Sequence, residues 1–317
     1  MQNGHVESFH GRLRDECLNA NWFRTLNDVR STLATWRREY NRERPHSWLA
    51  YRTPAEFRIA LGYGDVESKQ RFSGGRKLIA PGLAAQETIK VIHSPRFMRE
   101  PMATEGQIEA NPLHAELLEI AAMARHDFML DVTLTSSRII SGVFAGTPVE
   151  AHAAGVRFLQ ETGLHRLPER ADLVITSAAG HPLDLTFYQM IKGITAAQHV
   201  VKPGGRILVL GECGEGVGSA EFARNLEAYA GHQQYLDDIR DSAVEVDQWQ
   251  LEKLALVGLR HDLYFYSPGV TRRQIGSLAE RHYTDLNAAI MAAMAGLSHD
   301  ARIVLIPDGP YTYARVE

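Results

Sequence analysis

The sequence predicts an α/β fold with a mainly parallel sheet flanked by helices. Three observations support this fold class. The composition is that of a globular protein, with 44% hydrophobic and 23% charged residues in a chain of 317. Short apolar runs typical of buried strands recur in the second half, and helical stretches lie between them. The strand runs are ADLVITS (171–177), RILVLG (206–211), LYFYS (263–267) and RIVLIPDG (302–309). Strands that alternate with helices at this interval favour a parallel sheet covered on both faces.

Residues 1–60 predict helices. Thr25 and Asp28 form a loose capping box, and apolar residues then recur at helical spacing to about Arg44. Pro45 ends this helix. Thr53, followed by proline, starts a further short helix, because threonine is a good N-cap and proline is tolerated in the first turn.

The same sixty residues have their own charge balance. They hold ten arginines, no lysine and seven carboxylates, a net charge of +3, whereas the remaining 257 residues carry −7. Guanidinium groups match phosphate oxygens and attract a polyanion. Phosphate binding and a solvated helix face both explain this pattern.

The elements between residues 105 and 211 follow from their local signals. Asn111 and Pro112 start a helix, and Pro148 starts another. A helix is expected from about Leu185 to His199, followed by a turn at KPGG. Strands are expected at FMLDVTL (128–134) and RIISGVFAG (138–146), and a loop at GECGEGVGS (211–219).

Two glycine-rich segments invite a nucleotide interpretation. In RFSGGRKLIAPG (71–82), Lys77 is followed by leucine and its two glycines are adjacent, so the P-loop pattern fails. The glycines of GECGEGVGS do not give G-x-G-x-x-G, which favours a plain loop over a dinucleotide site.

Tyr188, Gln189 and Lys192 are a candidate binding cluster. On a helix, Tyr188 and Lys192 are four residues apart and share a face, with Gln189 beside them. Because parallel sheets bind ligands beyond the carboxyl ends of their strands, a phenol, an amide and an ammonium there suit a small carboxylate or keto acid. The alternative is a solvated helix edge with a half-buried tyrosine.

Few features point to a compartment. Cys17 and Cys213 lie far apart in sequence and form neither a disulfide framework nor a metal motif. No apolar run approaches the roughly 18 residues of a membrane helix, and the N-terminus has no apolar signal region. We therefore expect a cytoplasmic protein with no membrane partner.

The first segment resembles a known family. The strings VESFHGRLRDECLN (6–19) and WRREYNRERPHSWLAYRTPAEF (36–57) resemble the C-terminal end of insertion-sequence transposases of the retroviral-integrase type. The resemblance implies that Glu7 matches the third carboxylate of an Asp-Asp-Glu set holding two metal ions for phosphoryl transfer to DNA. Both aspartates of that set would lie upstream of Glu7. Without them, Glu7 is expected to be a carboxylate on a helix surface with no catalytic activity.

A second resemblance covers residues 72–317. The strings FSGGRKLIAPGL, VIHSP, EANPLHAELLEIA, GVFAGTPVEAHAAG, ADLVITSAAGHPLDLTFYQMIKGITAA, VKPGGRILVLGEC and LYFYSPG resemble successive segments of nickel-dependent lactate racemase. That family carries a nickel pincer nucleotide (pyridinium-3,5-bisthiocarboxylic acid mononucleotide nickel) and acts on a small 2-hydroxy acid by hydride transfer to the cofactor. The resemblance implies that Lys77 tethers this cofactor and His93 binds its nickel. It also places Tyr188, Gln189 and Lys192 near the substrate and cofactor, with Trp249 in the same site.

The chain also departs from that family. Glu67 stands ten residues before Lys77, where the resemblance implies a histidine base. A second catalytic histidine and an arginine for the substrate carboxylate would lie further upstream, where this chain resembles a transposase. We therefore expect a gene fusion in which neither half is catalytically competent. The expected parts are a transposase fragment (1–60), a junction (61–71), a truncated remnant of the racemase first lobe (72–160) and the racemase C-terminal lobe (161–317).

Two alternatives remain. One is an active isomerase, a 2-hydroxy acid racemase or epimerase that uses Glu67 as a substitute base. The other is a DNA-binding module confined to residues 1–60, whose affinity would depend on salt.

Overall fold

The chain forms two compact units. The computed structural model describes residues 32, 35, 38–45, 53, 56, 70–73, 84–123, 128–135 and 139–317. The first unit comprises Met1–Ala84 and Leu117–Gly163, and the second comprises Ala85–Glu116 and Leu164–Glu317. In the part of the chain so described, no helix has the length and hydropathy needed to cross a membrane.

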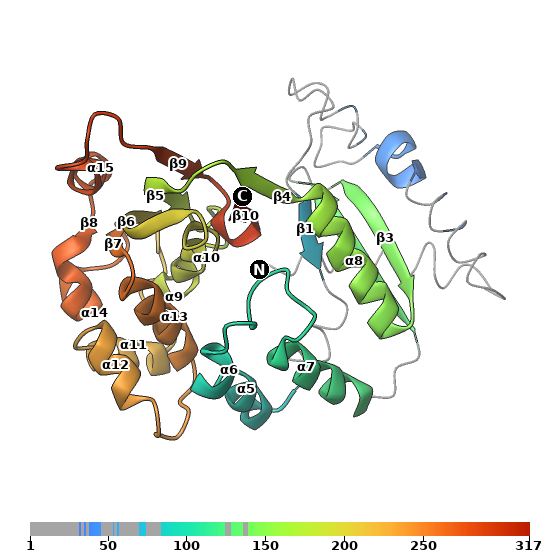
Figure 1. The fold of residues 1–317 in the computed structure, drawn as a ribbon, viewed down its shortest axis with the longest axis horizontal. Helices are drawn as coiled ribbons and strands as arrows, with labels where there is room; N and C mark the ends of the chain where they lie inside the picture. Colours follow the sequence, from blue (N-terminus) through green and yellow to red (C-terminus); the bar gives the residue numbers. More distant parts are fainter. Residues whose placement is uncertain are drawn as a thin grey trace. The chain divides into compact units, whose positions relative to one another are not determined.

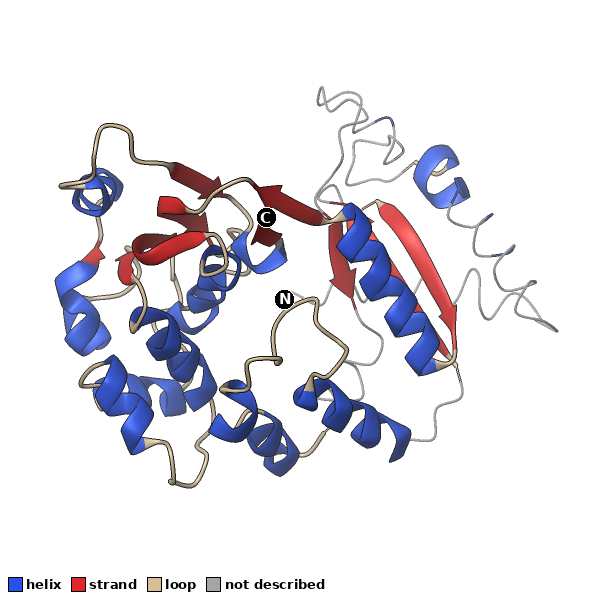
Figure 2. Ribbon diagram, viewed as in Figure 1, coloured by secondary structure: helices blue, strands red, loops and turns tan. Residues whose placement is uncertain are grey.

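The second unit is built on a parallel five-stranded sheet in the order β8-β7-β6-β5-β9 (Figure 1; Figure 2). The strands are β5 (Ala171–Ser177), β6 (Val201–Leu210), β7 (Asp262–Tyr266), β8 (His282–Tyr283) and β9 (Ile303–Ile306). The chain adds strands in one direction from β5 to β8 and then returns to pair β9 with the other side of β5. The order therefore reverses beside β5, and in such sheets ligands bind past the carboxyl ends of the strands at this point.

Helices cover both faces of this sheet. The connection from β5 to β6 contains α9 (Phe187–Met190), η4 (Ile191–Gly193) and α10 (Ile194–Ala197). The connection from β6 to β7 contains α11 (Ala220–Glu227), α12 (His232–Asp238) and α13 (Gln248–Gly258). Later connections contain α14 (Arg272–Ile275), η5 (Gly276–Arg281) and α15 (Leu286–Met294).

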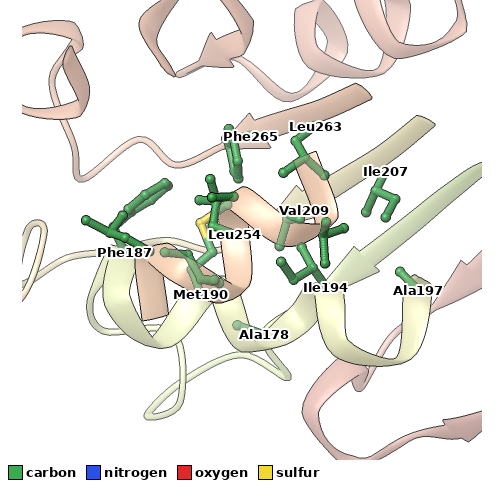
Figure 3. Packing of buried hydrophobic residues seen from close by; sticks show 14 of the residues in the cluster. Ala178, Phe187, Met190, Ile194, Ala197, Ile207, Val209, Leu254, Leu263 and Phe265 are labelled. Carbon is green, nitrogen blue, oxygen red and sulfur yellow. The ribbon is translucent and has the colours of Figure 1, made fainter. Parts of the chain in front are cut away.

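The core follows the alternation of the strands. Val209 and Phe265 point to one face, where they pack with Met190, Ile194 and Leu254 from the helices (Figure 3). On the other face, Ala289 and Ala293 of α15 pack with Leu173, Leu208 and Tyr264. Because successive side chains of a strand point to opposite faces, continuous apolar strands need a cover on each side. The predicted α/β class is confirmed.

The remaining elements of the second unit lie before β5 and after β9. Segment 85–116 contains α5 (Gln86–Ile92), α6 (Pro95–Met98) and the start of α7 (Pro112–Met123). After β9, η6 (Gly309–Tyr311) leads into β10 (Tyr313–Val316), which pairs in parallel with β4 (Leu164–Leu167).

The first unit contains an antiparallel sheet in the order β1-β2-β3. Its strands are β1 (Gln70–Ser73), β2 (Met129–Thr135) and β3 (Ile140–Gly146), and α8 (Pro148–Thr162) packs on them. The strands expected at 128–134 and 138–146 thus exist, but they form a hairpin outside the parallel sheet. A short connection allows only antiparallel pairing, because a parallel crossover needs a dozen or more residues.

The described part of residues 1–60 agrees with the predicted helix boundaries. A π-helix, η2 (Glu39–Glu43), has Arg44 as its C-cap, directly before the proline. The Thr53 N–H donates to a carboxylate oxygen of Glu56 at 2.9 Å, and the Glu56 N–H donates to Thr53 Oγ1 at 3.1 Å. This is the reciprocal capping expected where Thr53 starts a helix.

Two local expectations were wrong. The helix expected over Leu185 to His199 is divided into α9, η4 and α10. At Gly193 an added Cβ would lie 3.0 Å from the carbonyl oxygen of Ser177, so the chain passes too close to β5 for a larger residue. KPGG is not a turn between elements but lies within β6. The pairing passes from Ala171↔Val201 to Leu173↔Arg206, so these four residues leave the ladder as a bulge, with Gly204 at φ +71°.

Candidate functional site

Four side chains predicted for the site lie together in the second unit. His93, the C-cap of α5, lies against Trp249 of α13, with ring centroids 4.7 Å apart and the ring planes tilted by 35°. The Trp249 indole N–H donates to the Tyr188 hydroxyl oxygen at 2.9 Å. Lys192 Nζ lies 5.6 Å from the centroid of the Tyr188 ring. These contacts join an imidazole, an indole, a phenol and an ammonium from three separate parts of the chain.

The imidazole of His93 is held through one of its two ring nitrogens. Nδ1 lies 2.9 Å from the carbonyl oxygen of Ile89, and because a carbonyl only accepts, Nδ1–H is the donor. Burial lowers the pKa of His93, as does the charge of Lys192, against opposing effects of the Ile89 carbonyl and Asp247. A neutral imidazole with its Nε2 lone pair unused is the form that binds transition metals.

Tyr188 is held as a neutral phenol. Burial raises the pKa of its hydroxyl to about 12, and the nearby Asp247 acts in the same direction while the Trp249 hydrogen bond opposes it. The Lys192 ammonium lies within cation–π distance of the ring. At neutral pH the pair therefore offers a hydroxyl dipole beside a fixed positive charge.

The glycine-rich loop that follows β6 positions Tyr188. The Phe187 and Tyr188 N–H groups donate to the carbonyls of Gly216 and Val217 at 2.9 and 3.0 Å. At Gly218, with φ +134°, an added Cβ would lie 3.1 Å from Tyr188 Cβ. The loop GECGEGVGS therefore holds the start of α9, and the close approach to Tyr188 gives Gly218 a steric reason to be glycine.

Gln189 lies between Tyr188 and Lys192 in sequence and is half-buried. Its backbone N–H donates to Thr186 Oγ1, the N-cap of α9, at 3.3 Å. The cap fixes the first turn of α9 and therefore the direction in which these neighbouring side chains leave the backbone.

The loops after β5 and β6 are hydrogen-bonded to each other. Asp184 is 8% exposed, and its carboxylate accepts the Glu212 N–H at 3.0 Å while its carbonyl accepts the Cys213 N–H at 2.8 Å. Burial raises the pKa of the Cys213 thiol to about 12, so this residue is an inert thiol at neutral pH. These hydrogen bonds join the two loops at the carboxyl end of the sheet.

Asp247 is a site residue that the sequence did not reveal. It precedes α13 with φ +66°, a left-handed conformation that is sparsely populated for residues other than glycine and costs about 1–3 kcal/mol. Its carboxylate accepts a hydrogen bond from Ser219 Oγ at 2.6 Å and raises the pKa of both His93 and Tyr188. An aspartate directly before a helix indicates an N-cap. Asp247 makes no capping bond to α13, so this local pattern indicates a role that the residue does not have.

Three predicted residues, Lys77, Glu67 and Glu7, lie outside the described residues. Within the described residues, no group of three or more His, Cys, Asp or Glu side chains could hold a metal ion. The fold and this cluster together define an α/β lobe with a candidate site at the carboxyl end of a parallel sheet.

Two protein families match the chain in different segments. Residues 167–311 match the family described as "Lactate racemase C-terminal domain". Residues 1–54 match the family described as "Integrase core domain".

Individual relatives agree with this division. A lactate racemase of Thermoanaerobacterium thermosaccharolyticum is 33% identical over 259 residues, which cover 80% of this chain and 60% of that protein. The structure of the lactate racemase apoprotein from the same organism has a TM-score of 0.70 at 32% identity and covers 78% of this chain and 61% of that one. The uncharacterized 31.7 kDa protein of insertion element IS407 from Burkholderia multivorans is 55% identical over 56 residues, 18% of this chain and 20% of that protein.

Residues 72–317 therefore resemble the C-terminal part of lactate racemase, and residues 1–60 resemble the C-terminal end of an insertion-sequence transposase. The chain joins an integrase-like segment to a lactate racemase-like region, and it spans about 60% of the length of the lactate racemase that it matches.

Proposed function

We propose that residues 72–317 bind a nickel pincer nucleotide and a small 2-hydroxy acid, and that this chain does not complete racemisation by itself. The observation that carries the proposal is the contact of His93, Trp249, Tyr188 and Lys192 within one compact unit. A cluster assembled by one unit needs no second domain to bring its members together.

The chemistry of the donors fits the cofactor. His93 presents one imidazole nitrogen, and a nickel ion already held by its own organic ligands needs only one such donor from the protein. Lys77 would hold the cofactor covalently through its amine. When bound, the cofactor would supply the acceptor for a hydride that leaves the substrate carbon carrying the hydroxyl.

The substrate would be a small carboxylate. Lys192 supplies a positive charge for the carboxylate, and the neutral Tyr188 phenol and the Gln189 amide supply uncharged polar groups beside it. The Trp249 ring lies against His93 and limits water on that side. These groups bind and orient, but none of them is poised to move the hydroxyl proton at neutral pH.

General acid–base catalysis is the part of racemisation for which these side chains provide no group. Glu67 stands where the resemblance implies a histidine, and residues 1–60 resemble a different protein. Acid–base catalysis typically contributes about 10²–10⁴ in rate. We therefore expect a lobe that binds without turnover.

The test is to express the chain together with the cofactor-synthesis proteins and to measure nickel by mass spectrometry and D/L-lactate exchange. Nickel should be retained by the wild type and lost in His93→Ala and Lys77→Ala. The matched control is His165→Ala, an exposed histidine on β4, which should keep its nickel. Lactate exchange well above background would overturn the absence of turnover, and a nickel-free wild type would overturn cofactor binding.

Two other functions are supported by single observations. An active racemase or epimerase with Glu67 as the base would lose turnover in Glu67→Gln. A DNA-binding module in residues 1–60 is supported by the ten arginines of that segment. It would show salt-dependent binding to duplex DNA that disappears when residues 1–60 are deleted.

A further inference from the structure

A buried ion pair joins the segment that carries His93 to the helix that carries Trp249. Arg99 Nε donates to Glu252 Oε1 at 2.7 Å, and the Glu252 side chain is fully buried in α13. A second guanidinium nitrogen of Arg99, Nη2, donates to the carbonyl oxygen of Leu236 in α12 at 2.8 Å. One side chain of the segment is therefore bonded to two helices, all within the second unit.

The backbone between His93 and Arg99 is short and closely hydrogen-bonded. It forms α6, with Ser94 as the N-cap and Arg99 as the C-cap. The Ser94 carbonyl accepts the Phe97 N–H at 2.9 Å, and the Pro95 carbonyl accepts the Arg99 N–H at 3.2 Å. The Phe97 side chain is buried. A shift of Arg99 relative to α13 would therefore carry His93 with it.

Glu252 and Trp249 lie on one side of α13. They are three residues apart, and residues at this spacing are neighbours on the surface of a helix. Arg99 binds this side of α13, so its guanidinium determines how α6 approaches the surface that carries the indole ring. The outcome of that approach is the contact between His93 and Trp249, whose ring centroids are 4.7 Å apart.

The chemistry of the ion pair favours a role in positioning. The attraction within a buried ion pair offsets the cost of desolvation only when the hydrogen bonding is complete, and well-packed apolar side chains often stabilise a fold as well or better. Among the described residues, Glu252 Oε2 has no hydrogen-bond partner, so the bonding here is incomplete. What apolar side chains cannot supply is direction, because the planar guanidinium donates its hydrogen bonds at fixed angles. The pair therefore defines one arrangement of α6 against α13.

We propose that Arg99 and Glu252 are positioning residues of the candidate site: their ion pair sets the placement of α6 against α13 and thereby holds the imidazole of His93 against the Trp249 ring. The inference rests on the proposed function only for the nickel that His93 would bind. The contact of the two rings is a property of the chain alone, so its test needs no ligand.

The test uses the full chain and separates position from stability. The apolar double variant, Arg99→Met with Glu252→Met, should unfold at a urea concentration at least as high as the wild type, as is common when a buried ion pair is replaced by apolar residues. Arg99→Lys keeps the charge, but its single nitrogen cannot reproduce the fork that reaches both Glu252 and the Leu236 carbonyl. The matched control is Arg96→Lys, which changes an exposed arginine of the same helix.

The position of His93 is read by NMR from the ring protons of labelled histidine. Spectra are taken at a pH of about 8, where the imidazole is neutral because burial lowers its pKa. His93→Gln assigns the signal. The ring current of the indole displaces this signal in the wild type, and Trp249→Leu gives its position without that ring. We expect the apolar double variant and Arg99→Lys to lose most of this displacement and Arg96→Lys to keep it.

A purely structural ion pair would change the urea midpoint but leave the His93 signal in place. A displacement equal to that of the wild type in the folded apolar double variant would overturn the proposal. If that variant does not fold, the same result in Arg99→Lys overturns it. A nickel-free wild type in the experiment above, with the His93 signal displaced and lost as expected, would refute the proposed function and leave the positioning role intact.

Discussion

Removal of Arg99 should leave a buried carboxylate without its counter-ion. Glu252 of α13 is fully buried, and its Oε1 accepts from Arg99 Nε at 2.7 Å. Its Oε2 has no hydrogen-bond partner among the residues that the structure describes. Arg99 also donates to the Leu236 carbonyl at 2.8 Å, so it joins the segment that carries His93 to both α12 and α13.

The expected cost of Arg99→Ala follows from these contacts. Removing one partner of a buried ion pair typically costs about 3–5 kcal/mol. Arg99 is 27% exposed, so water can partly replace it, and Glu252 can take up a proton. We therefore expect a loss of about 3 kcal/mol at pH 7.5, the lower end of that range.

The cost should depend on pH with a definite sign. Burial raises the pKa of Glu252 above its ordinary value of 4.5, and Arg99 opposes this effect. Without Arg99 the folded-state pKa rises further. A carboxyl with a raised folded-state pKa favours the fold below its unfolded-state pKa, and this contribution is lost as the pH rises through the folded-state value. Arg99→Ala should therefore cost less at pH 5 than at pH 7.5.

Urea unfolding followed by circular dichroism at the two pH values measures this difference. Arg96→Ala, an exposed arginine on the same short helix, should cost no more than about 0.5 kcal/mol. Adding Glu252→Gln to Arg99→Ala should restore part of the stability at pH 7.5, because the uncompensated charge is gone. A cost below about 1 kcal/mol at pH 7.5, or equal costs at both pH values, would refute the reasoning.

Three further predictions concern packing and caps, each measured as the free energy of unfolding. Leu254→Ala should cost about 2–5 kcal/mol because the side chain is fully buried, whereas Leu259→Ala, 48% exposed, should stay within about 0.5 kcal/mol; similar values for both would contradict the core assignment. Gly193→Ala should cost about 1–3 kcal/mol, since its Cβ would lie 3.0 Å from the Ser177 carbonyl oxygen, and a neutral result would mean that the chain can move apart there. Thr147→Ala should cost about 1 kcal/mol through loss of the N-cap of α8, with Thr147→Ser as the control that keeps it.

Much of the architecture could be predicted from local patterns. The strands β5, β6, β7 and β9 and the starts of α7 and α8 follow from apolar runs, prolines and capping residues. The strands β4, β8 and β10 were not predicted, because two to four residues carry too little alternation to be distinguished from a loop. The close approach of Gly193 to Ser177 is a contact that no local pattern contains.

The site was predictable only in part. The spacing of Tyr188 and Lys192 placed two of its members on one face of a helix, and their contact is present. The roles expected for His93 and Trp249 came from resemblance to a family, and the structure adds that their rings are in contact. Asp247 was missed because its significance lies in a backbone angle and a contact with Ser219.

The sequence by itself determined the alternation of strands and helices, the difference in charge between residues 1–60 and the remainder, and the two family resemblances, since all of these are properties of neighbouring residues. Only the tertiary structure decided that segment 85–116 belongs to the second unit and brings His93 onto Trp249. The physical reason is that periodicity and capping act over a few residues. The packing that joins α5, α9 and α13 depends on side chains distant in sequence that become neighbours only when the chain folds.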